Sequence, residues 1–173
     1  MEDISTTWIA GQLVSFVALA LCVIGFASKR DDRLFVLLIF ANVAFAFQFA
    51  LFGSWVASGI TALIVLRVIL VRRYKGNTIV MTALLAATII VTVLTWSGLR
   101  DLAALAAGVL GTYGMFMLEG IPMRLLLAAA AFCWVLSNAF VGSIGGTAAE
   151  SLILLTNAIT IARLARERHV PVH

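Results

Sequence analysis

Charged side chains are scarce in this sequence. Asp, Glu, Lys and Arg make up 12% of its 173 residues, whereas hydrophobic types make up 63%. Soluble globular domains average about 25% charged and about 45–50% apolar residues. The shortage of charge excludes a water-soluble fold and predicts an integral membrane protein.

Cysteine and histidine are also few, with two residues of each type. Cys22 and Cys133 lie inside apolar runs, so neither resembles half of an extracellular disulfide framework. His169 and His173 stand in a basic tail, so the sequence offers no Cys/His cluster for zinc. The common nucleophile, zinc-protease and phosphate-loop motifs are absent as well. We therefore predict a protein that is not an enzyme and needs no cofactor.

The segment before the first hydrophobic run is acidic. Residues 1–7 contain Glu2 and Asp3 but no Lys or Arg, so they lack the basic region of a cleavable signal peptide. We expect the first run to remain as a helix.

Seven apolar runs follow one another, each close to the roughly 20 residues that a membrane-spanning helix needs. They cover residues 8–27, 34–52, 55–71, 78–96, 102–118, 123–141 and 147–165. The connections between them are too short for a soluble domain. The sequence predicts an all-α, polytopic membrane protein, with one transmembrane domain over residues 1–173 and seven transmembrane helices.

Basic residues concentrate on one side of this predicted bundle. If the helices alternate in direction, one side receives ten of the twelve Lys and Arg residues and the other receives only Arg100. The ten are Lys29, Arg30, Arg33, Arg72, Arg73, Lys75, Arg124, Arg163, Arg166 and Arg168. The positive-inside rule then places the N-terminus outside and the C-terminus in the cytoplasm. Such a rim suits anionic membrane lipids, and we expect no nucleic-acid partner.

Two further features concern the membrane boundary. Arg67, the twelfth basic residue, lies inside the third run, and we expect it to snorkel to the headgroups at the basic end rather than to contact a substrate. Trp8, Trp55 and Trp96 fall at the predicted outer ends of helices, as an aromatic belt requires.

The chain compares with itself at an offset of about 90 residues. Arg33-Leu34 corresponds to Arg124-Leu125, and Gly53-Ser54 corresponds to Gly142-Ser143. This order predicts two three-helix repeats, residues 8–73 and 102–165, joined by a linker helix at 78–96. A single linker helix gives the two repeats the same orientation, an arrangement found in SWEET carriers. Alternatively, any seven-helix chain that follows the positive-inside rule shows similar loop charges.

Several amides lie at membrane depth. Asn138 follows Trp134 by four residues, so both share one helix face, and Asn157 lies in the middle of the seventh run. Asn42 and Gln48 on the second run would form the opposing wall. An indole plane with carboxamides suits a small neutral polar solute. Alternatively, each amide only bonds a neighbouring helix, which contributes about 0.6 kcal/mol on average.

Glu150 has two interpretations. Thr147-Ala-Ala-Glu150 has the form of a capping box, which would make the carboxylate structural. An intramembrane carboxylate is also a candidate for gating or coupling.

Gly108, Gly111 and Gly114 form a stripe of small residues on the fifth run. Such a stripe lets membrane helices approach closely. It supports a second hypothesis, a membrane protein that transports nothing and binds a partner protein, a lipid or a second copy of itself through this glycine face or through the basic cytoplasmic rim.

The segment from Trp134 through Asn138, Gly142-Ser-Ile-Gly-Gly-Thr147 and Glu150 to Asn157 resembles the YgjV family of bacterial inner-membrane proteins. More remotely, the three-one-three layout resembles the superfamily of SWEET, PQ-loop and PnuC carriers, although Gln12 follows Gly11 rather than proline. The first resemblance implies the inner membrane. The second implies that Trp134, Asn138 and Asn157 contact substrate, and the leading prediction is a carrier that works by alternating access.

Overall fold

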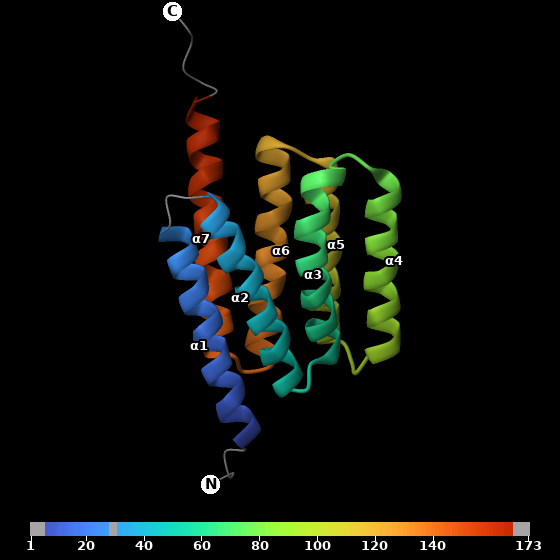
Figure 1. The fold of residues 1–173 in the computed structure, drawn as a ribbon, viewed down its shortest axis with the longest axis vertical. Coiled ribbons are helices and arrows are strands. Elements are labelled where there is room, and N and C mark those ends of the chain that lie inside the picture. Colours follow the sequence, from blue (N-terminus) through green and yellow to red (C-terminus); the bar gives the residue numbers. More distant parts are fainter. Residues whose placement is uncertain (1–5, 28–30, 168–173) are drawn as a thin grey trace, which may run out of the picture.

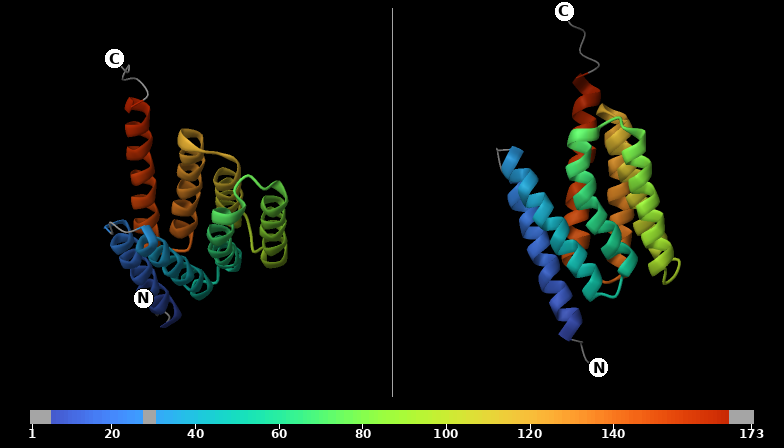
Figure 2. Two further views of the ribbon diagram at one scale, coloured as in Figure 1. Left: turned by 45° about the horizontal axis from the view of Figure 1, so that its top comes forward. Right: turned by 45° about the vertical axis from the view of Figure 1, so that its right-hand side comes forward.

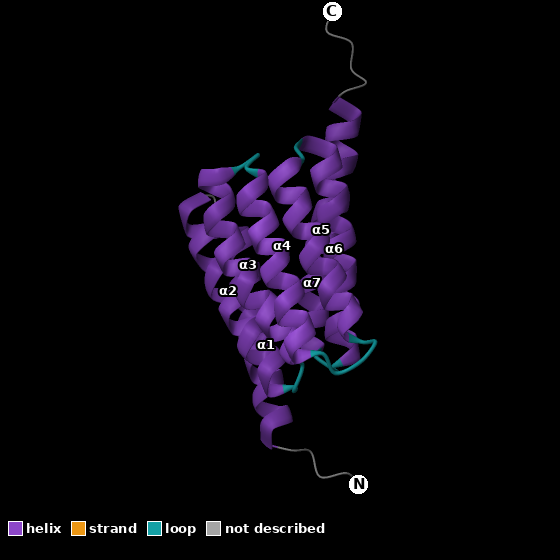
Figure 3. Cartoon of the chain, turned by 90° about the vertical axis from the view of Figure 1, so that its right-hand side faces the viewer, coloured by secondary structure: helices purple, strands orange, loops and turns teal. Residues whose placement is uncertain are grey.

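The structure is a computed structural model that describes residues 6–27 and 31–167. Seven helices make up nearly all of this part of the chain, and it contains no strand (Figure 3). They are α1 (Thr6–Ala27), α2 (Asp31–Leu51), α3 (Trp55–Tyr74), α4 (Thr78–Thr95), α5 (Asp101–Met117), α6 (Gly120–Phe140) and α7 (Ile144–Glu167). The predicted all-α fold is confirmed, and every helix boundary lies within three residues of its predicted position.

Five of the helices in the described ranges are long and apolar enough to cross a membrane: α1, α3, α4, α6 and α7. The other two have shorter apolar stretches, because α2 opens with Asp31-Asp32-Arg33 and α5 has only 17 residues. Both nevertheless run beside the five long helices (Figure 1). The molecule is therefore a polytopic helical membrane protein.

The helices pack in a simple order. Going around the bundle, α1, α2, α3, α5, α6 and α7 each contact the next, and α7 closes the ring on α1. The remaining helix, α4, packs on α3 and α5 at the edge farthest from α1 (Figure 2). Large apolar side chains such as Leu94 and Val93 point outward and are 77% and 71% exposed, as a lipid-facing surface requires.

The core consists of two clusters of buried side chains. The larger joins α2, α3, α5 and α6 around Phe49, Ile60 and Trp134. The smaller joins α1, α2 and α7 around Cys22 and Phe45. Alanines fill much of both clusters, so the helix backbones come close together.

The glycine stripe of α5 is buried within this core. A Cβ on Gly108 would touch Ile60, one on Gly111 would touch Arg67, and one on Gly114 would touch Leu126. The chain's own α3 and α6 therefore occupy the stripe. The hypothesis that this face binds a partner is wrong, because the face is not on the surface.

The two Gly-Ser turns have the same geometry. Gly53 and Gly142 have φ angles of 73° and 74°, in the left-handed region that glycine tolerates. In both turns the glycine N–H bonds the carbonyl three residues earlier, and the following serine N–H bonds the carbonyl five residues earlier. These bonds form a Schellman motif, which ends α2 and α6 and returns the chain antiparallel.

The two ends of the bundle differ in side-chain type. Arg72, Arg73, Lys75 and Arg124 lie at the end where α3 meets α4 and α5 meets α6, and α7 carries Arg163 and Arg166 to the same end (Figure 1). Trp8, Trp55 and Trp96 lie at the opposite end and are 39%, 60% and 45% exposed. Lys29, Arg30 and Arg168, which were also predicted for the basic end, lie outside the described residues.

Candidate functional site

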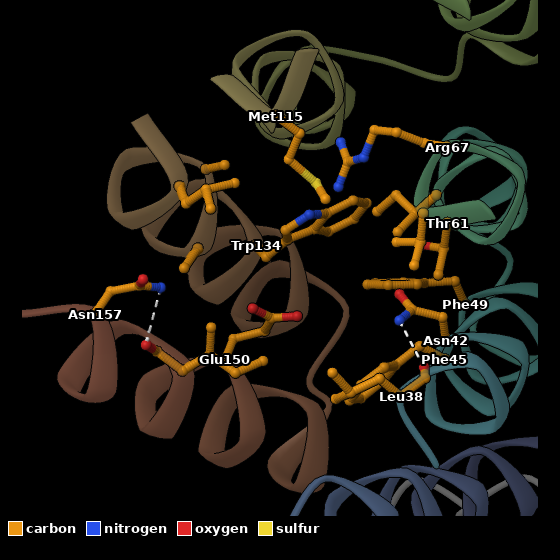
Figure 4. A pocket seen from close by; sticks show the side chains of 16 residues that line it. Leu38, Asn42, Phe45, Phe49, Thr61, Arg67, Met115, Trp134, Glu150 and Asn157 are labelled. Carbon is orange, nitrogen blue, oxygen red and sulfur yellow. Dashed lines mark hydrogen bonds between the residues drawn. The ribbon is translucent and has the colours of Figure 1, made fainter. Parts of the chain in front are cut away.

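A cavity of about 240 Å³ lies inside the bundle between α2, α3, α6 and α7 (Figure 4). Four of the six predicted site residues line it: Asn42, Trp134, Glu150 and Asn157. They come from α2 and from the consecutive helices α6 and α7, so the ring order of the helices brings the two halves of the chain together. The wall also contains apolar side chains, including Phe45, Phe49 and Met115.

Trp134 provides a flat apolar surface. Its side chain projects from α6 and is only 6% exposed. The ring centroids of Trp134 and Phe49 are 5.6 Å apart, with an angle of 36° between the ring planes. This contact holds the indole in place beside the cavity.

Asn42 and Asn157 line the cavity and also make hydrogen bonds within the bundle. Asn42 Nδ2 donates to the Leu38 carbonyl at 2.8 Å, and Asn157 Nδ2 donates to the Ile153 carbonyl at 3.2 Å. Each amide is thereby fixed against its own helix while it lines the cavity. Asn157 Oδ1 also accepts a bond of 3.5 Å from Arg124 Nη1.

Gln48 and Asn138 do not line the cavity, which corrects their predicted place in its wall. Gln48 Nε2 donates to Asn138 Oδ1 at 2.8 Å, and Asn138 Nδ2 donates to the Trp134 carbonyl at 3.0 Å. The two side chains are 0% and 1% exposed. Because Asn138 lies a full turn beyond Trp134, it meets α2 directly, and the pair ties α2 to α6.

Glu150 is not part of a capping box, because α7 begins at Ile144, one turn before Thr147. Ser143 caps the helix instead, since its Oγ accepts the Gly146 N–H at 3.0 Å. Thr147 Oγ1 donates to the Ser143 carbonyl at 2.7 Å. The Glu150 carboxylate thus lies in the second turn and faces the cavity. Within the described residues it has neither a hydrogen bond nor an ion pair.

Arg67 is the site residue that sequence reasoning missed. It does not snorkel to the headgroups, because its side chain is only 7% exposed and lines the cavity from α3. Gly111 leaves room for it, since a Cβ there would lie 2.5 Å from Arg67 Nη1. Arg67 Nη1 is 3.5 Å from Thr112 Oγ1, and Arg67 Nε has no partner. An arginine inside one span with a glycine stripe on another was the signal available in the sequence.

Comparison with known proteins identifies the family of this chain. A family model described as a bacterial inner membrane protein, Imp-YgjV, matches residues 9–168. The chain belongs to the YgjV family. A member of this family, inner membrane protein YgjV of Escherichia coli strain K12, is 26% identical over 159 residues, which cover 92% of this chain and 86% of the relative. No solved structure matches the chain.

Family membership confirms the resemblance predicted from the sequence and identifies a multi-pass protein of the bacterial inner membrane. The more remote resemblance to SWEET carriers finds no support in these matches.

Proposed function

We propose that this protein carries a small polar solute across the inner membrane by alternating access. The cavity supports this function, because an aromatic surface, two amides, a carboxylate and a guanidinium line one internal space. Glu150 lies six residues from the start of α7, and Arg67 lies seven residues from the end of α3. At 1.5 Å per residue each lies roughly 10 Å from its own end of the bundle, and the two ends are opposite, so the cavity lies toward the midplane, where carrier sites are found.

The helix order supports two parallel repeats, residues 8–73 and 102–165. If α1, α2 and α3 are exchanged with α5, α6 and α7, the same neighbours remain in contact around the ring. The closing contact of α7 with α1 then corresponds to that of α3 with α5. A twofold axis along the membrane normal gives this order, with α4 as the linker. The cavity lies between the repeats, where rocking of one against the other would expose it to each side in turn.

The charge asymmetry supports an orientation. Basic side chains gather at the end where α7 finishes, and exposed tryptophans gather at the other end. The positive-inside rule assigns the basic end to the cytoplasm, so the C-terminus would be cytoplasmic and the N-terminus periplasmic.

The first test is binding followed by transport. The purified protein in detergent is screened by thermal shift against sugars, nucleosides, vitamins and amino acids. A ligand at 100 times its dissociation constant adds about 2.7 kcal/mol to the stability of the folded state. A solute that binds is then labelled, and its uptake is measured in proteoliposomes with empty liposomes as the baseline.

Variants of cavity residues test whether the binding and uptake signals come from the cavity. Asn42→Ala and Asn157→Ala should reduce both binding and uptake, since each removes a cavity amide. Thr160→Ala is the matched control: its hydroxyl makes the same kind of bond to its own helix, to the Thr156 carbonyl at 2.8 Å, but it does not line the cavity. If a folded, reconstituted protein neither binds nor moves any solute in the panel, the carrier proposal fails and binding of a partner protein or lipid becomes the leading function.

A further inference from the structure

The two charged groups of the cavity point to a more specific ligand than a neutral polar solute. Arg67 reaches the cavity from α3 and Glu150 reaches it from α7, and in the view of Figure 4 the Trp134 indole lies between the two charged groups. No ion pair joins them, and the ion pair between described residues is Lys75 with Glu119 at the surface. The wall of the cavity therefore contains a cation from one helix and a carboxylate from another, with an indole nearby.

Arg67 has more donors than the chain satisfies. A guanidinium carries five N–H donors and is always protonated. The acceptor provided by the described residues is Thr112 Oγ1, at the long distance of 3.5 Å, while Arg67 Nε is buried without a partner. Burying a cation in this way is costly unless an anion or other acceptors complete its shell. The planar fork of arginine fits a carboxylate with two parallel bonds.

Glu150 presents the complementary situation. Its carboxylate faces the cavity without a donor from the described residues. The Trp134 indole lines the same cavity, and an aromatic face attracts a cation. The wall around Glu150 thus favours an ammonium group on the ligand.

We propose that the cavity binds a zwitterionic solute of α-amino-acid type, with its carboxylate on Arg67 and its ammonium group toward Glu150 and Trp134. A ligand with only an anionic group would face Glu150, and a ligand with only a cationic group would face Arg67. Either kind of ligand would leave one charge of the cavity wall without a partner, and this cost makes the site select against both kinds. The proposal rests on the carrier function above and names its substrate class.

The test uses the detergent-solubilised full chain and the twenty common L-amino acids as probes in a thermal-shift assay. The strongest binder is then compared with two analogues of nearly the same size, its carboxamide and its 2-hydroxy acid. The carboxamide keeps only the cation and the hydroxy acid keeps only the anion. Because a hydrogen bond to a charged group contributes about 1.5–3 kcal/mol, each analogue should bind about tenfold to a hundredfold more weakly.

Two variants assign each end of the ligand. Arg67→Gln should bind the amino acid and its carboxamide with equal affinity, and Glu150→Gln should bind the amino acid and its hydroxy acid with equal affinity. Arg163→Gln and Glu119→Gln remove the same charges from exposed positions and should keep the discrimination of the unmodified protein. If a cavity variant fails to fold, the comparison of analogues on the unmodified protein still decides.

Two outcomes would overturn the proposal that the ligand is a zwitterion. One is a sugar, nucleoside or vitamin that binds while no amino acid does, which leaves the carrier function standing. The other is equal binding of an amino acid and both analogues. If no solute of any class binds or is transported, the carrier function fails together with this inference.

Discussion

At the residue scale, the polar side chains inside the bundle fall into two groups. Gln48 and Asn138 bond each other and lie outside the cavity, whereas Asn42 and Asn157 line it, with each amide nitrogen bonded to its own helix and Asn157 Oδ1 also bonded to Arg124 of α6. The first arrangement holds two helices together. The second leaves part of each amide available to a ligand.

The hydrogen bond between Gln48 on α2 and Asn138 on α6 should contribute measurably to the free energy of unfolding. We expect a double-mutant cycle of Gln48→Leu and Asn138→Leu, followed by unfolding in mixed micelles, to give a coupling energy of about 0.6–1.7 kcal/mol. The reason is that Gln48 Nε2 donates to Asn138 Oδ1 at 2.8 Å between two fully buried side chains. Asn42→Leu combined with Asn138→Leu is the control, and those effects should add to within about 0.3–0.5 kcal/mol. If the effects of Gln48→Leu and Asn138→Leu simply add, the hydrogen bond between these residues does not stabilise the contact of α2 with α6.

The variant Gly111→Ala tests whether ligand binding depends on the position of the Arg67 side chain. Gly111→Ala places a methyl group against Arg67 Nη1, the far end of a flexible side chain, which can move aside at little cost. We expect the thermal midpoint to change little and solute affinity to fall, because the guanidinium shifts within the cavity. Gly59→Ala is the control, since its Cβ meets Val91 Cγ1 at 2.5 Å, on a residue outside the cavity wall. Unchanged affinity in Gly111→Ala would separate Arg67 from binding.

At the scale of helices, the contact between α1 and α7 closes the ring. Gln12 Nε2 donates to the Gly142 carbonyl, and the Ile144 N–H donates to Gln12 Oε1 at 3.1 Å. One side chain on α1 therefore secures the turn that begins α7. Gly145 lies beside it, where the two backbones meet at Ser15.

Gly145→Ala should destabilise this contact. Its Cβ would lie 2.6 Å from the Ser15 backbone carbon, and a helix backbone cannot move aside as a side-chain end can. We expect a loss of about 1–3 kcal/mol, the usual cost of overpacking, measured by unfolding in mixed micelles. Ala148→Leu adds more atoms at an exposed position on the same helix and should be nearly neutral. A stable Gly145→Ala variant would show that α1 and α7 can separate freely.

At the scale of the whole molecule, seven helices that alternate in direction place the start of α1 and the end of α7 at opposite ends of the bundle (Figure 1). The basic end and the tryptophan end then give the orientation two independent markers. The basic side chains and the tryptophans lie in the short connections and at the helix ends. Their positions therefore depend little on how side chains pack inside the bundle.

Reporter fusions test the orientation. A green fluorescent protein fused after residue 173 should fluoresce, because it folds in the cytoplasm, and alkaline phosphatase at the same place should be inactive. Alkaline phosphatase fused after Gly98, between α4 and α5, should be active in the periplasm. The reverse pattern at both sites would invert the proposed orientation. Activity at neither site would show that the first four helices do not cross the membrane as proposed.

The sequence by itself determined the membrane class, the position of all seven helices and the family. These properties depend on local signals: apolar length, charged or glycine-containing connections, and a recognisable segment around Trp134 and Glu150. Four cavity residues were also predictable, because polar side chains are rare at membrane depth and stand out.

Only the tertiary structure decided which face of each helix points inward. In a membrane the lipid-facing side of a helix is as apolar as the packed side, so hydropathy does not distinguish the two. For this reason the sequence misplaced Arg67 at the headgroups and Asn138 and Gln48 in the cavity, and it offered the α5 glycines to a partner although α3 and α6 cover them. Glu150 was ambiguous for a related reason: a shift of one helical turn in the start of α7 converts a cap into a cavity residue.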